Sequence, residues 1–212
     1  MQYEKIYQRT EAYFNEKIEK FGSNSIGVGW NGNDAQRIRY DQLAKLLSAD
    51  GENFSVCDYG CGYGYFYSYL KEKFPDWKGI YAGLDVSDKM IEEAKRKFGQ
   101  NEAKRIFIND SKLNDTYDYI VSSGIFNLKL ETSEEEWKKY ILETINRFHS
   151  HSEKGFAFNA LTKYSDKDKM REDLYYSDPL FLFDYCKTNF SKNVALLHDY
   201  QLYDFTIIVR KF

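Results

Sequence analysis

The sequence predicts an α/β protein with a doubly wound, mostly parallel seven-stranded sheet, a C-terminal antiparallel hairpin and an N-terminal helical lid. From about residue 34 onward, short apolar runs alternate with longer helix-like segments, and strands that are separated by helices pair in parallel. A loop with three glycines at 60–64 follows the first run and precedes a helix. The last two runs, 193–198 and 205–212, have no helix between them, which predicts the hairpin.

Each strand is predicted from a run of apolar, β-branched or aromatic residues of strand length. The runs, in chain order, are 54–57, 79–84, 105–108, 117–122, 156–161, 193–198 and 205–212. Ligands of such sheets bind beyond the carboxyl ends of the parallel strands. We therefore expect the functional residues where these runs end.

The helices are predicted from capping residues and from apolar positions that repeat with a period near 3.6 residues. One helix is expected from the glycine loop to about Phe74. Proline at a first helical position, as at Pro179, loses no needed hydrogen bond, and the serine and glutamates at 133–136 form a capping box. The start signals are Asn33 or Asp34, Ser87, Ser133-Glu134-Glu135-Glu136 and Ser177-Asp178-Pro179.

The composition favours one domain with a packed core, because 42% of the 212 residues are hydrophobic. The chain has 2 prolines and no stretch rich in serine and glycine that would mark a linker. We therefore expect a single domain over 1–212, in which residues 1–48 form the helical lid and residues 49–212 form the core.

Charge and cysteine content limit the partners. The net charge is -3, whereas nucleic-acid binders need a basic surface to displace counterions from phosphates, so a nucleic-acid partner is disfavoured. The charged N-terminus lacks an apolar signal segment, and no apolar run approaches the ~20 residues that span a bilayer. Cys57, Cys61 and Cys186 lack metal-ligand spacing and are expected to be reduced thiols. These observations predict a cytoplasmic protein without a membrane segment or a metal site.

The glycine loop carries the first indication of a ligand. Its glycines let the backbone turn sharply and approach a bound molecule, and the following helix presents free amides. A dinucleotide site needs a small residue three positions after the second glycine, but Tyr65 stands there, and the third glycine is Gly64. Asp58 before the loop would repel a pyrophosphate and suits a cationic ligand. NAD is therefore disfavoured.

Polar residues also end the next two predicted strands. Asp85 lies 25 residues beyond Gly60, and a carboxylate at this place can accept both ribose hydroxyls of a nucleoside. Asn109-Asp110 ends the third strand and can hydrogen-bond an adenine amino group. Each residue alone is as often a turn residue or a cap. Together with Asp58 they favour a nucleoside that carries positive charge.

These motifs resemble those of the class I S-adenosylmethionine (SAM)-dependent methyltransferases. VCDYGCGYG at 56–64 and GLDVSDKMIEEA at 83–94 resemble the first two motifs of that family. IND at 108–110 and YDYIVSSGIFN at 117–127 resemble the third and fourth. The match extends from about residue 50 to the C-terminus and implies SAM as the cofactor.

The resemblance also implies roles for individual residues. The glycines of the loop would flank the methionyl group of SAM, Asp85 would hold the ribose, Asp110 would contact adenine and Ser123 would lie beside the cofactor. The expected cofactor-binding residues are Trp30, Arg39, Asp58, Gly60, Cys61, Gly62, Gly64, Asp85, Val86, Met90, Asp110 and Ser123.

The segment Gly27-Val28-Gly29-Trp30 resembles a feature of a smaller set of bacterial small-molecule methyltransferases, as do Gln36 with Arg39, Asp199-Tyr200 and Asp204-Phe205. Trp30 is expected to pack over the pocket, and Gln36 or Arg39 to reach the methionyl end or the substrate, because closure would exclude water from the reacting centre. The alternative is a tryptophan in ordinary core contacts behind the sheet.

Methyl transfer from a sulfonium depends mostly on alignment of the nucleophile with the methyl group. A general base is needed only when the acceptor is a poorly acidic hydroxyl. His198 is the nearest candidate for a base, although a hydrogen-bonded surface histidine is the commoner role. His149 and His151 are expected at a helix C-terminus, where a cationic histidine is favourable.

The charged connection 162–176 is long enough to be functional and is expected to join the lid. Its Lys163 and Arg171, together with Arg39, favour an anionic substrate. The predicted function is methyl transfer from SAM to a small molecule, with oxygen as the acceptor atom. Two alternatives remain, a SAM-binding protein without catalysis and a methyltransferase that acts on a macromolecule, although the net charge and the absence of a proline-rich aromatic motif after the fourth strand disfavour the latter.

Overall fold

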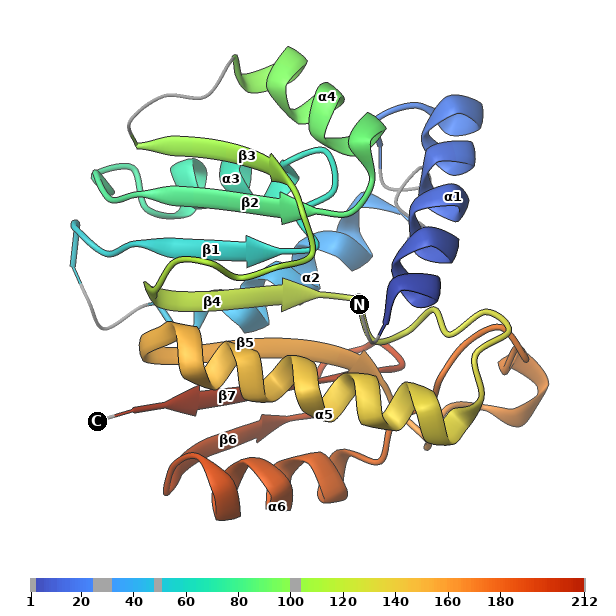
Figure 1. Cartoon of the computed structure of the whole chain (residues 1–212). Helices are drawn as coiled ribbons and strands as arrows, with labels where there is room; N and C mark the ends of the chain where they lie inside the picture. The colour runs from blue at the N-terminus through green and yellow to red at the C-terminus, as the bar shows by residue number, and fades with distance from the viewer. Residues whose placement is uncertain (1–2, 25–31, 48–50, 100–103, 212) are drawn as a thin grey trace.

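The computed structural model describes residues 3–24, 32–47, 51–99 and 104–211. Its centre is a seven-stranded sheet in the order β3-β2-β1-β4-β5-β7-β6, shown in Figure 1. The first five strands are parallel, and β7 runs antiparallel to both β5 and β6. The predicted doubly wound sheet with a C-terminal antiparallel hairpin is confirmed.

All seven predicted strands are present, with shifted ends. The strands are β1 (Val56–Tyr59), β2 (Tyr81–Asp85), β3 (Arg105–Asn109), β4 (Tyr117–Ser123), β5 (Ser152–Leu161), β6 (Asn193–Leu197) and β7 (Asp204–Arg210). The largest difference is β5, which begins four residues earlier than predicted. The preceding helix ends at His151, so the chain enters the sheet without a loop.

Six α-helices and one short 3-10 helix are found in the part of the chain that the structure describes. They are α1 (Glu4–Phe21), α2 (Asn33–Ala44), α3 (Tyr65–Lys73), α4 (Asp88–Phe98), α5 (Glu134–His151), η1 (Lys167–Lys169) and α6 (Pro179–Asn189). None of these helices is long and apolar enough to cross a membrane.

The predicted capping residues act as caps at three helices. The Ser87 hydroxyl accepts a hydrogen bond from the amide of Met90, and the Ser133 hydroxyl accepts one from the amide of Glu136. The Asp178 carboxylate accepts from two amides of α6. The predicted cap of α2 differs, because Gly32 takes the capping position and provides no side chain.

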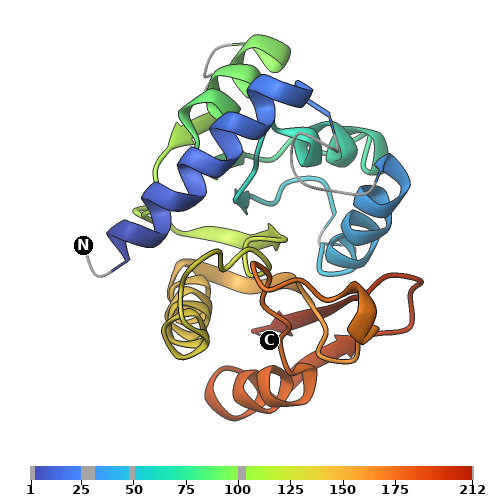
Figure 2. The same cartoon turned by 90° about the vertical axis from the view of Figure 1, so that its right-hand side faces the viewer.

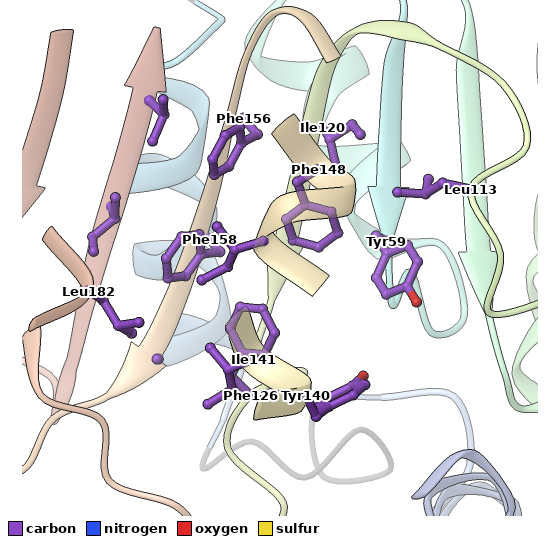
Figure 3. Packing of buried hydrophobic residues seen from close by; sticks show 14 of the residues in the cluster. Tyr59, Leu113, Ile120, Phe126, Tyr140, Ile141, Phe148, Phe156, Phe158 and Leu182 are labelled. Atoms are coloured by element: carbon purple, nitrogen blue, oxygen red, sulfur yellow. The ribbon is translucent and has the colours of Figure 1, made fainter. Parts of the chain in front are cut away.

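Two apolar layers cover the sheet. Side chains of α2, α3 and α4 pack with one face, and side chains of α5 and α6 pack with the other. Figure 3 shows the second layer, in which Phe148 of α5 lies near Phe156 and Phe158 of β5. These layers leave the carboxyl ends of the parallel strands uncovered by core helices, and α1 lies along that edge (Figure 2).

Candidate functional site

A cavity of about 360 Å³ lies at the carboxyl edge of the parallel strands, within the size range of small-molecule sites. Most of the residues expected to bind a cofactor line it. These are Arg39, Asp58, Gly60, Cys61, Gly62, Asp85, Val86, Met90, Asp110 and Ser123. Gly64 does not line the cavity. Trp30, with the rest of 27–30, lies outside the described residues.

The turn after β1 needs glycine for both conformation and space. Gly60 and Gly62 have φ angles of 80° and 54°, in the region where a side chain is unfavourable. A Cβ atom at Gly60 would lie 2.3 Å from Cγ2 of Ile125. The amides of Gly60 and Cys61 both donate to the Leu84 carbonyl, at 2.7 and 3.0 Å. The turn is therefore fastened to the end of β2, beside Asp85.

Asp85 is oriented by backbone donors on two segments. The amide of Gly62 donates to one carboxylate oxygen at 2.8 Å, and the amide of Ser87 donates to the other at 2.9 Å. Burial raises the pKa of the carboxyl group, and the backbone hydrogen bonds act in the opposite direction. A carboxylate oxygen can accept more than one hydrogen bond. Asp85 therefore joins the glycine loop to the start of α4 and can still accept from a ligand.

Asp58 is a buried acid at the end of β1. It accepts a hydrogen bond of 2.7 Å from the Tyr81 hydroxyl. Burial, together with the nearby Asp85, raises the pKa of Asp58 to about 7, although the hydrogen bond from Tyr81 lowers it. A cationic ligand would lower the pKa of Asp58, because an opposite charge favours the ionised form of a carboxyl group.

Gly64 serves the packing of α3 and not the cavity wall. Its φ is 78°, and a Cβ atom there would lie 2.9 Å from the ring of Phe107. The expectation that Gly64 flanks the methionyl group therefore lacks the contact that it requires. The resemblance placed the third glycine in the motif, but the neighbouring Tyr63 and Tyr65, and not Gly64, line the cavity.

We expect Gly64→Ala to destabilise the fold by about 1–3 kcal/mol, because it combines a left-handed conformation with a clash inside the core. Urea unfolding measures this change. The ligand affinity of the folded fraction should stay within about twofold of the parent chain, because Gly64 does not line the cavity. Loss of affinity without loss of stability would return Gly64 to the binding site.

Arg39 is held by an ion pair with a residue that is distant in the sequence. Its guanidinium donates to the buried Asp204 carboxylate at 2.5 Å and to the Ala35 carbonyl at 2.9 Å. The side chains of both Arg39 and Asp204 are almost completely buried. The pair joins α2 to the start of β7 and places Arg39 in the cavity wall beside Gln36.

The three cations that favoured an anionic substrate are each paired with an aspartate. Arg39 pairs with Asp204. Lys163 pairs with Asp178 at 2.7 Å and does not line the cavity. Arg171 makes two hydrogen bonds to Asp173. Because all three cations are already paired, these positions no longer support the prediction of an anionic substrate.

The histidines lie away from the cavity. His198 is exposed, and its ring packs near the rings of Tyr164 and Phe205, so its position gives no support to a role as a base. His149 and His151 lie in the last turn of α5, as predicted. Burial, followed by the nearby Lys211, lowers the pKa of His149, which disfavours the cationic form expected at that position.

Several cavity residues were not anticipated. On α1 they are Tyr7, Thr10, Tyr13 and Phe14, and in the connection and hairpin they are Ser165, Lys169, Leu174 and Tyr203. The α1 residues recur at helical spacing, which marks one face of a helix. The pattern could have identified the face, but aromatic residues at such spacing serve ordinary packing more often than a binding site.

The helix α1 crosses the edge of the sheet and is anchored at both ends (Figure 2). Near its start, the Tyr3 and Tyr140 ring centroids are 5.3 Å apart, and Arg147 donates to the Tyr7 hydroxyl at 3.1 Å. Near its end, the Ser87 hydroxyl donates to the Asn15 side chain at 2.6 Å. The helix therefore bridges α5 and α4 over the cavity.

Comparisons with known proteins agree with this geometry. The family described as "Methyltransferase domain" matches residues 57–152. A Mycobacterium tuberculosis protein named "Putative methyltransferase" is 48% identical over 158 residues, which are 74% of this chain and 93% of that protein. The match therefore spans nearly the whole of that relative.

Two further likenesses are narrower. A malonyl-[acyl-carrier protein] O-methyltransferase of Priestia megaterium is 32% identical over 97 residues, which are 44% of this chain and 35% of that enzyme. A crystal structure of a SAM-dependent methyltransferase from Aquifex aeolicus superposes with a TM-score of 0.56, at 18% identity, over 93% of this chain and 98% of that one. This last likeness concerns the fold.

Proposed function

The chain belongs to the class I SAM-dependent methyltransferases, and from that premise we propose that it transfers the methyl group of SAM to an oxygen atom of a small molecule bound in the same cavity. SAM is the cofactor. The observation that carries the proposal is the cavity at the carboxyl edge of the parallel strands. It combines the motif residues of β1 and β2 with side chains of α1 and of the connection 162–178.

The ribose of SAM is assigned to Asp85. Its two oxygens are oriented by the amides of Gly62 and Ser87, so the carboxylate needs no rearrangement to accept two ribose hydroxyls. Val86 and Met90 form an apolar wall next to it, and Asp110 lies at the end of the neighbouring strand. These positions support the assignment of adenine to the region around Asp110.

The methionyl end is assigned to the other side of the glycine loop. Gly60, Cys61 and Gly62 present backbone to the cavity, and Ser123 lies across from them at the end of β4. Asp58 supplies negative charge for the ammonium and sulfonium groups. Arg39, held by Asp204, lines the cavity with guanidinium donors that suit the carboxylate of the same ligand.

When bound, SAM supplies an electrophilic methyl group on a positively charged sulfur atom. The contribution of the chain is to align the acceptor with the methyl carbon and to exclude water. Alignment of two bound reactants can lower the activation free energy by ~7–11 kcal/mol. Asn159 holds the turn after β4 in place, since it accepts from the Gly124 amide at 2.8 Å and donates to the Ser123 hydroxyl at 3.2 Å.

The N-terminal region is assigned the role of a lid. We propose that residues 1–212 act as one domain, in which 49–212 hold the cofactor and α1, within the predicted lid 1–48, covers it, whereas α2 packs on the sheet face with α3 and α4. The anchors of α1 on α4 and α5 support this division, as do the side chains of Tyr7 and Phe14 in the cavity wall. The lid would exclude water from the reacting centre.

The proposed function is tested by ligand binding and by product formation. SAM and its demethylated product should raise the melting temperature, whereas NAD should not, because only ligands of the folded state stabilise it. A screen of pooled metabolites with SAM should then yield a product heavier by one methylene unit in the mass spectrum. SAM binding without any product would favour a SAM-binding protein without catalysis.

The lid is tested by hydrogen exchange. The backbone amides of α1 should exchange more slowly when S-adenosylhomocysteine is added, because the ligand would contact the face that carries Tyr7 and Phe14. Amides of α6, which does not line the cavity, serve as the internal control. Unchanged exchange in α1 at saturating ligand would contradict the lid.

A further inference from the structure

The cavity extends beyond the residues assigned to SAM, over the ends of β4 and β5 and the start of β7. This acceptor region is lined by Leu128, Leu161, Lys169, Leu174, Tyr176 and Tyr203. Backbone hydrogen bonds hold it together, since the Tyr175 amide donates to the Asn127 carbonyl at 2.8 Å and the Thr162 amide donates to the Tyr203 carbonyl at 3.0 Å. The connection 162–178 is therefore fastened to both the turn after β4 and the final hairpin.

The walls of the acceptor region are apolar and aromatic. Leu128, Leu161 and Leu174 supply aliphatic surface, and Tyr176 and Tyr203 supply rings. Tyr13 of α1 adds a third ring. Flat apolar groups are well accommodated between leucine and tyrosine side chains, because rings pack with little loss of conformational entropy.

General bases are scarce in the lining of this region. Among the described residues that line it, none is a histidine, aspartate, glutamate or cysteine. Asp58 is not among the residues of the acceptor region. It accepts a hydrogen bond from Tyr81, which packs in the apolar layer with α2 and α3. The Asp166 carboxylate, next to this lining, is engaged by Tyr203 and Lys169, so an acceptor whose nucleophile is already ionised fits the region best.

Lys169 is the cation of the acceptor region with the loosest pairing. Its ammonium nitrogen lies 3.5 Å from the Tyr203 hydroxyl and 3.8 Å from the Asp166 carboxylate. Arg171, by contrast, makes two hydrogen bonds to Asp173. An ammonium group has three donors, and the Lys169 side chain is 61% exposed. Lys169 can therefore turn toward an anion in the cavity and give up only these two long contacts.

We propose that the acceptor is a small carboxylic acid on a flat apolar body, that Lys169 binds one carboxylate oxygen, and that the other oxygen takes the methyl group. This proposal rests on the proposed function and specifies its substrate class. A lone pair of the carboxylate oxygen forms the new bond to the methyl carbon. The bond between that carbon and sulfur breaks, and its electron pair stays on sulfur. The products are a methyl ester and neutral S-adenosylhomocysteine, and no proton is transferred.

The test is a matched series of acceptors at saturating SAM. Benzoate and cinnamate are compared with their amides, with benzyl and cinnamyl alcohol, with phenol and with benzylamine. Methyl esters should form, while the alcohols and amides should give no product. The kcat for the carboxylate should stay flat from about pH 6 to 9, because no base has to lose a proton in that range.

The role of Lys169 is tested in the same assay. Lys169→Met should raise KM for the carboxylate roughly three- to tenfold, as expected for an exposed charged hydrogen bond, and leave kcat nearly unchanged. Lys169→Arg should restore most of the affinity. Lys167→Gln removes a charge from the same short helix at a residue that does not line the cavity, and its KM should equal that of the parent chain.

The outcomes separate this proposal from the proposed function. Product from phenol or an alcohol but from neither carboxylate would overturn the carboxylate proposal and leave methyl transfer to oxygen in place. An unchanged KM in Lys169→Met would remove Lys169 from the proposal. Absence of product from every class, with SAM binding confirmed by calorimetry, would count against catalysis itself and so against both.

Discussion

Replacing Asp85 with alanine should weaken SAM binding by about 100-fold or more, because hydrogen bonds to a charged acceptor contribute roughly 1.5–3 kcal/mol each. Two such bonds to the ribose would be lost. The carboxylate is oriented toward them by the amides of Gly62 and Ser87, so the parent chain spends no free energy on positioning it. Isothermal titration calorimetry with S-adenosylhomocysteine measures the effect.

The same substitution also removes the acceptor of two backbone amides, so the controls must separate folding from binding. Asp85→Asn keeps one acceptor oxygen but turns an amide group toward one of those donors. It should bind more weakly than the parent chain and more tightly than Asp85→Ala. Circular dichroism and urea unfolding establish that each variant is folded. A folded Asp85→Ala protein with unchanged affinity would refute the ribose assignment.

Replacing Asp58 with asparagine should stabilise the ligand-free protein at pH 8. The pKa of Asp58 is raised from 3.8 to about 7, so below pH 4 the acid is protonated in both states and burial carries no penalty. Between about pH 4 and pH 7 the unfolded state is ionised while Asp58 stays protonated in the folded state, so stability is lost over this range, on the order of 2–4 kcal/mol, and the loss is complete above about pH 7. The asparagine variant should lack this loss, because its side chain can still accept from Tyr81.

Asp58→Asn should also alter the pH dependence of SAM binding. In the parent chain the affinity should rise as Asp58 ionises near pH 7, because the carboxylate attracts the cationic ligand. The difference between the two proteins isolates Asp58, since the amino group of the ligand titrates in the same way with both. Calorimetry from pH 6 to 8.5 measures it. Parallel affinity profiles for the two proteins would exclude an electrostatic role for Asp58.

The sequence by itself determined the order of strands and helices and the location of the cofactor half of the cavity. Strand and helix periods are local properties, and so are the caps at Ser87, Ser133 and Asp178. The parallel arrangement follows from the alternation of strands and helices, and it brings the ends of β1 and β2 together. Asp58, Gly60 and Asp85 therefore meet in the cavity as the spacing predicted.

Only the tertiary structure decided which charged and aromatic side chains surround the rest of the cavity. Arg39 and Asp204 are 165 residues apart in the chain, and no local pattern indicates that one neutralises the other. The aromatic face of α1 reads as ordinary packing until the helix is placed across the sheet edge. Gly64 and His198 carry suitable residue types but do not line the cavity. Pairing partners and cavity walls depend on contacts between distant segments, and a residue's type and neighbours in sequence do not specify those contacts.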